Sequence, residues 1–267
     1  EMFRKDRADF ESKWNDMKII IEYGMLTEDK FFDKAKKFAM YADTDGGLHT
    51  FEAYLESIKE QQTDKDKKTV VLYASNKDAQ HSYIQNAKNK GYSVLLLDSP
   101  LTSHLLQKLE QEHENTTFAR VDSDLIDNLI KKDETRVAKL SDKQKEELKT
   151  RLETIVPKEK FTLKLEDMDS TEAPLVITVP EFMRRMKEMQ MTGGGGMMGM
   201  GDFPDMYDLI VNANHPLASK ILDTEDADAR GTAVNQALDL AKLQQNLLHG
   251  EELTAFIARS YELLGNE

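Results

Sequence analysis

Apolar residues in the first part of the chain recur with the spacing of helices. Phe3, Phe10, Trp14 and Met17 follow one another at intervals of seven, four and three residues, which places them on one helix face. A second helix is expected to begin at Thr27, because a threonine side chain can cap the first turn of a helix. We therefore expect the chain to open with packed helices.

Short apolar runs alternate with amphipathic segments in the next part of the chain. Residues 69–74 and 92–98 are rich in β-branched and apolar residues and flank one helical segment, which predicts two parallel strands joined by a right-handed crossover. The elements expected here are a turn at 43–47, helices at 50–61, 77–90, 101–112 and 123–131, and a third strand at 117–121. Residues 65–132 are therefore predicted to form a small αβα sandwich.

The C-terminal half has a different pattern. We expect a charge-rich helix at 133–155, a hairpin of strands 161–165 and 174–179, a helix opened by Pro180, a helical or extended segment at 206–212, and helices at 232–248 and 251–264. The predicted fold class is α+β and helix-rich. Its expected parts are a helical segment (1–64), the αβα subdomain (65–132) and a mixed α/β domain (133–267) that ends in a helical hairpin.

Composition narrows the possible functions. The chain of 267 residues is 39% apolar and 32% charged, as in soluble globular proteins, and its apolar runs are too short to cross a bilayer. Its net charge of −13 disfavours nucleic acid as a partner. The absence of cysteine excludes disulfides, thiolate zinc sites and a cysteine nucleophile. With no secretory leader in the sequence, we expect a cytoplasmic protein without a membrane partner.

No catalytic or metal-binding set emerges from the sequence. The six histidines lack metal-ligand spacing. A G-x-G-x-x-G pattern at Gly194, Gly196 and Gly199 neither follows a strand nor opens a helix, so we interpret it as a loop. The turn at 43–47 resembles a calcium loop only faintly, because the bidentate glutamate is missing. We expect no catalytic residue and no metal site.

The helix after Pro180 carries a methionine-rich stripe. Phe182, Met186 and Met189 are four and three residues apart and share one side with Met183 nearby, whereas charged residues occupy the other side. Methionine adapts to varied surfaces and is common where binding is promiscuous. The stripe is either an exposed binding surface or an ordinary part of the core.

The two last helices carry more apolar surface than one contact needs. The residues proposed for a contact between subunits are Val234, Leu238, Ala241 and Leu248 in the first helix and its end, and Leu253, Phe256, Ile257 and Leu264 in the second. One interpretation is a four-helix bundle formed with a second copy of the chain. The other is that both helices are buried within one subunit.

Four motifs of the chain occur together in one known family. They are Ile21-Glu22-Tyr23-Gly24, Leu95-Leu96-Leu97-Asp98-Ser99-Pro100, Arg120-Val121-Asp122 and Asn212-x-Asn214-His215-Pro216. With these motifs the chain resembles heat-shock protein 90 chaperones, above all the bacterial ones. The resemblance covers essentially the whole chain. It implies that residues 1–132 are the end of a middle domain and residues 133–267 a C-terminal dimerisation domain, and that the ATP-binding domain lies outside this sequence.

The resemblance also implies roles for particular residues. Phe182, Met186 and Met189 match a helix that contacts client proteins, and residues 104–107, including His104 and Gln107, match a second client-contact stretch. Bacterial members have an aromatic residue where this chain has His104. The fragment is expected not to be an enzyme and to need no cofactor, whereas the longer parent would use ATP and magnesium. Partners with tetratricopeptide repeats are not expected.

Three functions compete at this point. The first is a homodimeric, client-binding part of a molecular chaperone, which binds unfolded or partly folded proteins. The second is a small-molecule-binding α/β enzyme domain with its ligand at the carboxyl ends of the strands, near Ser75 and Asp98. The third is a structural dimer scaffold, which would require the methionine stripe to be buried.

Overall fold

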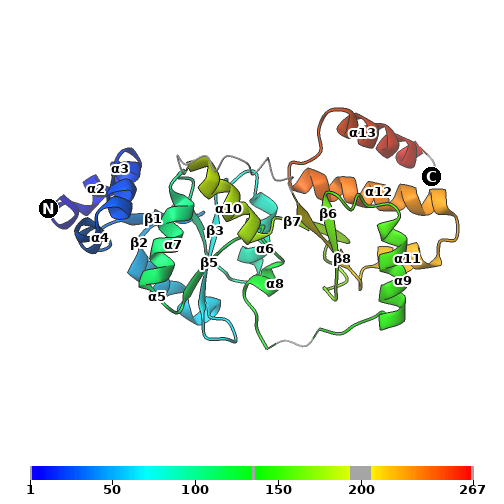
Figure 1. Cartoon of the computed structure of the whole chain (residues 1–267), viewed down its shortest axis with the longest axis horizontal. Coiled ribbons are helices and arrows are strands. Elements are labelled where there is room, and N and C mark those ends of the chain that lie inside the picture. The colour runs from blue at the N-terminus through cyan, green and yellow to red at the C-terminus, as the bar shows by residue number, and fades with distance from the viewer. Residues whose placement is uncertain (1, 134–135, 193–205, 266–267) are drawn as a thin grey trace. The chain divides into compact units, whose positions relative to one another are not determined.

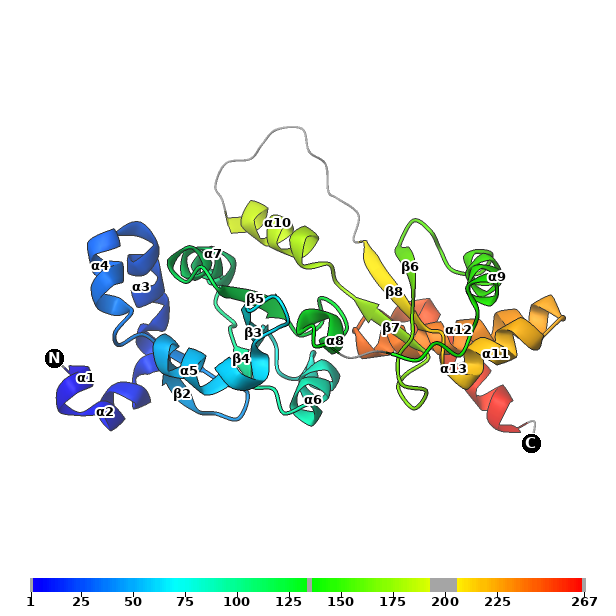
Figure 2. The ribbon, with the colours of Figure 1, turned by 90° about the horizontal axis from the view of Figure 1, so that it is seen from below.

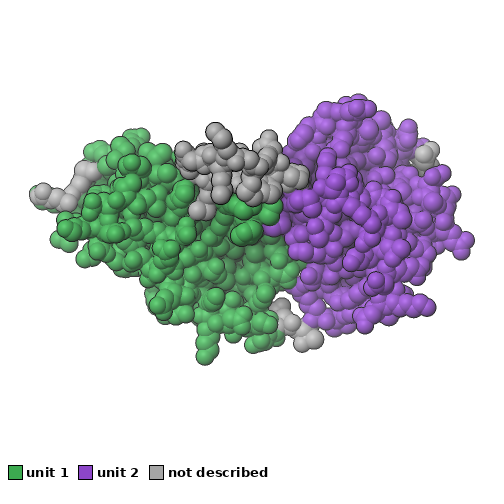
Figure 3. All heavy atoms as spheres, in the orientation of Figure 1, with its two compact units in different colours: residues 1–133, 181–199 green, residues 134–180, 200–267 purple. Residues whose placement is uncertain are grey.

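A computed structural model describes residues 2–133, 136–192 and 206–265 (Figure 1). The chain divides into two compact units (Figure 3): unit 1 contains Glu1–Asp133 and Glu181–Gly199, and unit 2 contains Glu134–Pro180 and Met200–Glu267. Residues from Glu181 thus group with unit 1, although we expected them within one continuous C-terminal domain. The predicted α+β, helix-rich class is confirmed.

Unit 1 opens with α1 (Met2–Lys5), α2 (Arg7–Ser12), α3 (Trp14–Thr27) and α4 (Asp29–Ala35). The predicted cap at Thr27 is wrong. Thr27 ends α3, where its hydroxyl donates to the Tyr23 carbonyl at 2.9 Å, and the extended Glu28 precedes α4. Gly24 lies inside α3, and the Phe31 ring packs on it. A Cβ at position 24 would be 2.9 Å from that ring, so the contact leaves no room for a larger residue.

A short hairpin follows, formed by β1 (Met40–Ala42) and β2 (Leu48–Thr50) and succeeded by α5 (Phe51–Gln62). The turn predicted at 43–47 is confirmed. The Asp43 carboxylate accepts hydrogen bonds from the amides of Asp45 and Gly47, both at 2.8 Å. Gly46 has a φ of +92°, which glycine adopts without strain.

The second part of unit 1 is a three-stranded parallel sheet with the order β4-β3-β5 (Figure 2). Its elements along the chain are β3 (Thr69–Ala74), α6 (His81–Asn89), β4 (Val94–Leu96), α7 (Thr102–Glu112), β5 (Thr116–Arg120) and α8 (Ile126–Leu129). The predicted parallel strands are confirmed. β3 is central and β5 forms one edge of the sheet.

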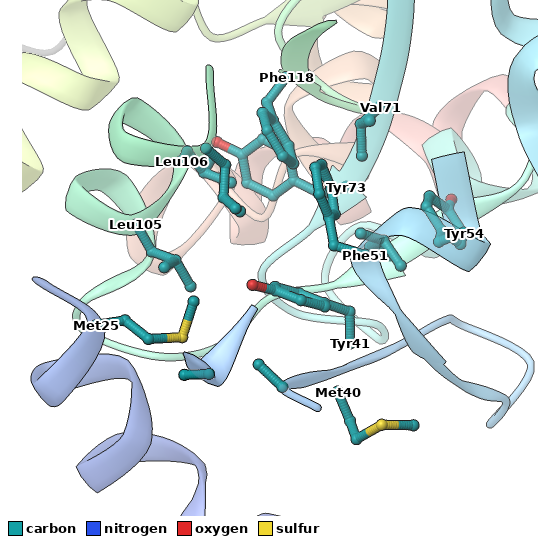
Figure 4. Packing of buried hydrophobic residues seen from close by; sticks show 14 of the residues in the cluster. Met25, Met40, Tyr41, Phe51, Tyr54, Val71, Tyr73, Leu105, Leu106 and Phe118 are labelled. Atoms are coloured by element: carbon teal, nitrogen blue, oxygen red, sulfur yellow. The ribbon is translucent and has the colours of Figure 1, made fainter. Parts of the chain in front are cut away.

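The core of unit 1 joins the opening helices to this sheet (Figure 4). The rings of Phe51 and Phe118 stack with their centroids 5.6 Å apart, beside the buried side chains of Tyr73 and Leu106. Burial of each such side chain contributes roughly 1.5–3 kcal/mol. The opening helices and the αβα sandwich therefore form one packed unit.

The first helix of unit 2 begins later than the sequence predicted. The helix predicted at 133–155 is wrong in its first part, because α9 (Asp142–Glu153) begins after Ser141. Ser141 and Gln144 form a capping box, which satisfies the free amides of the first turn. Val137, which precedes α9, is 79% exposed.

The sheet of unit 2 contains β6 (Phe161–Glu166), β7 (Leu175–Thr178) and β8 (Tyr207–Asn212) in the order β6-β8-β7. The predicted hairpin of the first two strands is wrong. β8 lies between them, parallel to β6 and antiparallel to β7. Leu209, Ile210 and Val211 are all buried, as expected for a central strand, so the ambiguous segment at 206–212 is extended.

The remaining helices are α10 (Glu181–Thr192), α11 (Pro216–Asp223), α12 (Ala227–Gln244) and α13 (Gly250–Gly265). α12 begins before its predicted start because the Asp226 carboxylate caps it, accepting from the amides of Asp228 at 2.8 Å and Ala229 at 3.1 Å. No helix in the described parts of the chain combines the length and apolarity needed to span a membrane.

Candidate functional site

Helix α10 is attached to unit 1 by its charged side. Arg184 is only 7% exposed, and its guanidinium donates to Glu181 at 2.6 Å, to Glu188 at 2.5 Å and to the Tyr73 hydroxyl of β3. The Ser103 hydroxyl of α7 donates to Glu188. A buried arginine and two partly exposed glutamates thus occupy the position that apolar side chains fill in most docked helices.

Arg185 extends this charged contact to α7 and β5. Its guanidinium donates to the Glu110 carboxylate at 2.9 Å and to the Phe118 carbonyl at 2.9 Å, and also to Glu181 at 2.7 Å. Charge-assisted hydrogen bonds of this kind are stronger than neutral ones. The side chains that hold α10 therefore form a connected network of opposite charges.

The ionised form of Glu181 is favoured by this network. Burial works to raise the pKa of Glu181. The charge and hydrogen bond of Arg184, followed by those of Arg185, together outweigh burial and lower the pKa below its ordinary value. A lowered carboxyl pKa stabilises the docked helix above the ordinary pKa. That contribution is lost as the pH falls through the lowered value.

Acid should consequently release α10. We expect hydrogen exchange in α10, corrected for intrinsic rates, to show constant protection between pH 5 and 8 and loss of protection below about pH 4. Glu181→Gln should cause the same loss at neutral pH, because it removes the charge that pairs with both arginines. Helix α7 serves as the internal control and should stay protected. Unchanged protection of α10 at pH 3 would contradict the ionic origin of its docking.

The apolar side of α10 points away from this contact. Phe182 is 74% exposed and Met183 and Met186 are partly exposed, and none of the three belongs to the hydrophobic cluster of unit 1. The side chain of Met189 lies outside the described residues. Because the charged side is docked, the stripe is not an ordinary part of the core.

The second predicted stretch lies on the neighbouring helix α7 (Figure 2). There His104 is partly exposed and Gln107 is exposed. The sequence placed the two stretches in different domains, whereas the structure places both helices in unit 1. Exposed residues of α7 and α10 can therefore contribute to one surface.

The carboxyl ends of the strands in unit 1 are engaged by other parts of the chain. The Gln80 side-chain oxygen accepts from the amides of Ser75 at 2.8 Å and Asn76 at 3.0 Å, and Lys18 pairs with Asp98. Sequence reasoning missed this role of Gln80. Among the described residues, no group of histidine and carboxylate side chains is arranged to hold a metal ion. These contacts do not favour the small-molecule enzyme hypothesis.

Helix α13 is attached to unit 2 in the same manner as α10 to unit 1. Arg259 donates to the Asp239 carboxylate of α12 at 2.5 Å and to Gln236 at 2.8 Å, and Lys242 pairs with Glu252 at 3.3 Å. In the described part of α13 no side chain is buried. Polar side chains thus join α13 to α12.

The apolar residues of α13 form an outward stripe. Ile257 is 44%, Tyr261 71% and Leu264 76% exposed. On α12, Leu240 and Leu243 are also exposed. The outward residues of these two helices give unit 2 an apolar surface that its own core does not use.

The residues proposed for subunit contact fall into two groups. Val234, Leu238, Ala241 and Leu248 are buried within unit 2, where they belong to its core, and their part in a contact between subunits stays a prediction. Leu253 and Phe256 are partly exposed, and Ile257 and Leu264 are exposed. Leu240, Leu243 and Tyr261 are exposed as well, although the predicted contact did not include them. The signal for them was the apolar excess of the two helices.

Comparisons with known proteins agree on one family. The family model described as Hsp90 protein matches residues 1–257. Chaperone protein htpG of Bacteroides fragilis (strain 638R) is 38% identical across 98% of this chain and 48% of its own length. Chaperone protein HtpG of Porphyromonas gingivalis (strain ATCC 33277) is 40% identical across 91% of this chain and 36% of its own length. The chain spans about half or less of these relatives, and it belongs to the Hsp90 family.

Proposed function

We propose that this chain is the part of an Hsp90 chaperone that pairs two subunits and binds unfolded or partly folded client proteins. One observation carries the proposal: α10 and α13 are both held by charged side chains and turn their apolar stripes outward. A helix oriented in this way gains little from hydrophobic burial in its own subunit. Its apolar side is available to another chain.

The two stripes have different partners in this proposal. The stripe of α13, with Leu240 and Leu243 of α12, packs against the same surface of a second copy. Phe182, Met183 and Met186 on α10, with Met189 by analogy of spacing and with His104 and Gln107 on α7, bind clients. Contacts with flexible methionines suit clients of varied sequence, and two linked client surfaces raise the effective affinity.

The division of labour within the longer protein follows from the same proposal. Residues 1–132 are the end of the middle domain, and residues 133–267 form the C-terminal domain from which α10 reaches the middle domain. ATP and magnesium act in parts of the parent protein beyond this sequence, and this part holds clients without a cofactor. We propose a cytoplasmic location, as expected from the sequence.

The proposal is tested by protection of an unfolding protein. The chain should suppress the aggregation of heat-unfolded citrate synthase without ATP, measured by light scattering. A chain ending at Leu248 lacks α13 but retains the core of unit 2, and we expect it to require at least about tenfold more subunits for equal protection, because the paired client surfaces are lost. Equal protection by both chains would contradict the role of pairing, and none by either would contradict client binding.

A further inference from the structure

The parallel sheet of unit 1 has an open edge at β5. Toward β3, the Thr69 amide donates to the Asn115 carbonyl at 2.8 Å and the Val121 amide donates to the Tyr73 carbonyl at 2.9 Å. In a parallel pair, alternate residues of a strand bond to the same neighbour. The backbone groups of Phe118 and Arg120 consequently point away from β3, toward the side of β5 on which the described residues form no neighbouring strand.

Side chains take the place of that missing strand. The Phe118 amide donates to the Glu110 carboxylate at 2.9 Å, the Phe118 carbonyl accepts from Arg185 at 2.9 Å, and the Arg120 amide donates to Glu181 at 3.4 Å. Two of these three partners belong to α10. Exposed strand edges pair readily with other extended chains unless they are covered. α10 therefore caps the edge of β5.

Little free energy is needed to separate α10 from the edge of β5. The described contacts of α10 with unit 1 include hydrogen bonds, ion pairs and the packing of the Arg184 guanidinium over the Tyr73 ring, and its described apolar side chains are absent from the hydrophobic cluster of that unit. Buried ion pairs contribute little net free energy, because water solvates the separated charges well. Moreover, α10 lies in the connection between β7 and β8, strands of the other unit. The helix can leave β5 without unravelling the core of either unit.

We propose that the edge of β5, once α10 is released, binds an extended segment of an unfolded polypeptide as an added strand. This proposal rests on the proposed client-binding function and adds a second, backbone-directed mode of recognition to it. The occupant is an extended chain because the groups involved are backbone donors and acceptors in strand geometry. They are the Phe118 carbonyl and the Arg120 amide, which α10 covers, and the Phe118 amide, which Glu110 of α7 covers. Such pairing is independent of client sequence, whereas the stripe of α10 selects apolar side chains.

The experiment uses a peptide of alternating valine and threonine with lysine at both ends, which favours extended conformations and lacks methionine and aromatic residues. Arg185→Ala removes the partner of the Phe118 carbonyl, so we expect it to bind the peptide about tenfold more tightly than the parent chain does. Lys187→Ala removes the same charge from an exposed position of the same helix and should bind like the parent. Binding is followed by the NMR shifts of the Phe118 and Arg120 amides.

Two controls separate the possible outcomes. A peptide N-methylated at alternate residues cannot form the added strand and should not bind. Protection of the Val121 amide, which bonds to β3, reports that the sheet remains intact in Arg185→Ala. Equal binding by the methylated peptide, or by Arg185→Ala and the parent chain, would overturn the edge proposal. Neither result would affect client binding at Phe182 and Met186, which is measured separately.

Discussion

Replacing Ile257 and Leu264 with aspartate is expected to turn a dimer into folded monomers. Both residues lie on the outward stripe of α13 and are 44% and 76% exposed, so neither supports the core of unit 2. In a dimer, each aspartate would place a charge in an apolar contact, and symmetry would place it there twice. We expect the dimer dissociation constant to rise at least about a hundredfold, which corresponds to ~2.7 kcal/mol.

Sedimentation equilibrium measures this change directly. Ala255→Asp is the matched control, because Ala255 is exposed on α13 but lies away from the stripe, and the variant should remain dimeric. The free energy of unfolding of the monomer should change by less than about 0.5 kcal/mol, as for other surface substitutions. If the parent chain is already monomeric at tens of micromolar, or if the double variant stays dimeric, the stripe does not join subunits.

The parallel sheet of unit 1 could be predicted because its information is local. The runs at 69–74 and 92–98 are apolar throughout, and an amphipathic segment between them leaves a parallel crossover as the simple solution. The pairing in unit 2 could not be predicted in this way. β8 inserts between β6 and β7, yet the connection from β7 to β8 contains α10, so proximity in sequence favoured the wrong hairpin.

Helix starts were missed where a cap outweighs the periodic pattern. Ser141 and Asp226 each satisfy amides of a first turn, and these contacts set the beginnings of α9 and α12. Hydrophobic periodicity extends beyond such caps or begins after them, because it reports which side of a helix is apolar and not where the helix starts.

The candidate surfaces were only partly predictable for a related reason. Spacing showed that Phe182 and Met186 share one side of α10 and that Arg184 and Glu188 share the other. Which side is docked depends on Tyr73, Glu110 and the edge of β5, which lie far away in sequence. Likewise, periodicity could not distinguish Val234, which is buried in unit 2, from Leu240, which is exposed.

Replacing Phe182 and Met186 with glutamine is expected to abolish most client binding by α10 without unfolding the chain. Phe182 is 74% exposed and Met186 partly exposed, so the substitutions remove little buried surface. Glutamine is a good helix former, so α10 should persist. Each apolar side chain contributes roughly 1.5 kcal/mol or more when a client covers it, and we expect at least about a hundredfold weaker binding for the pair.

Fluorescence anisotropy of a labelled, permanently unfolded client measures this loss, with Lys187→Gln as the matched control on the same helix. Thermal unfolding of the double variant should match that of the parent chain. A large fall in melting temperature would instead identify Phe182 and Met186 as core residues, since large-to-small or polar changes in a core cost several kcal/mol. Retained client binding with an unchanged melting temperature would place the client surface elsewhere. Because the charged side of α10 already contacts Tyr73, Glu110 and β5, its apolar side is the part of the helix that the proposal assigns to a client.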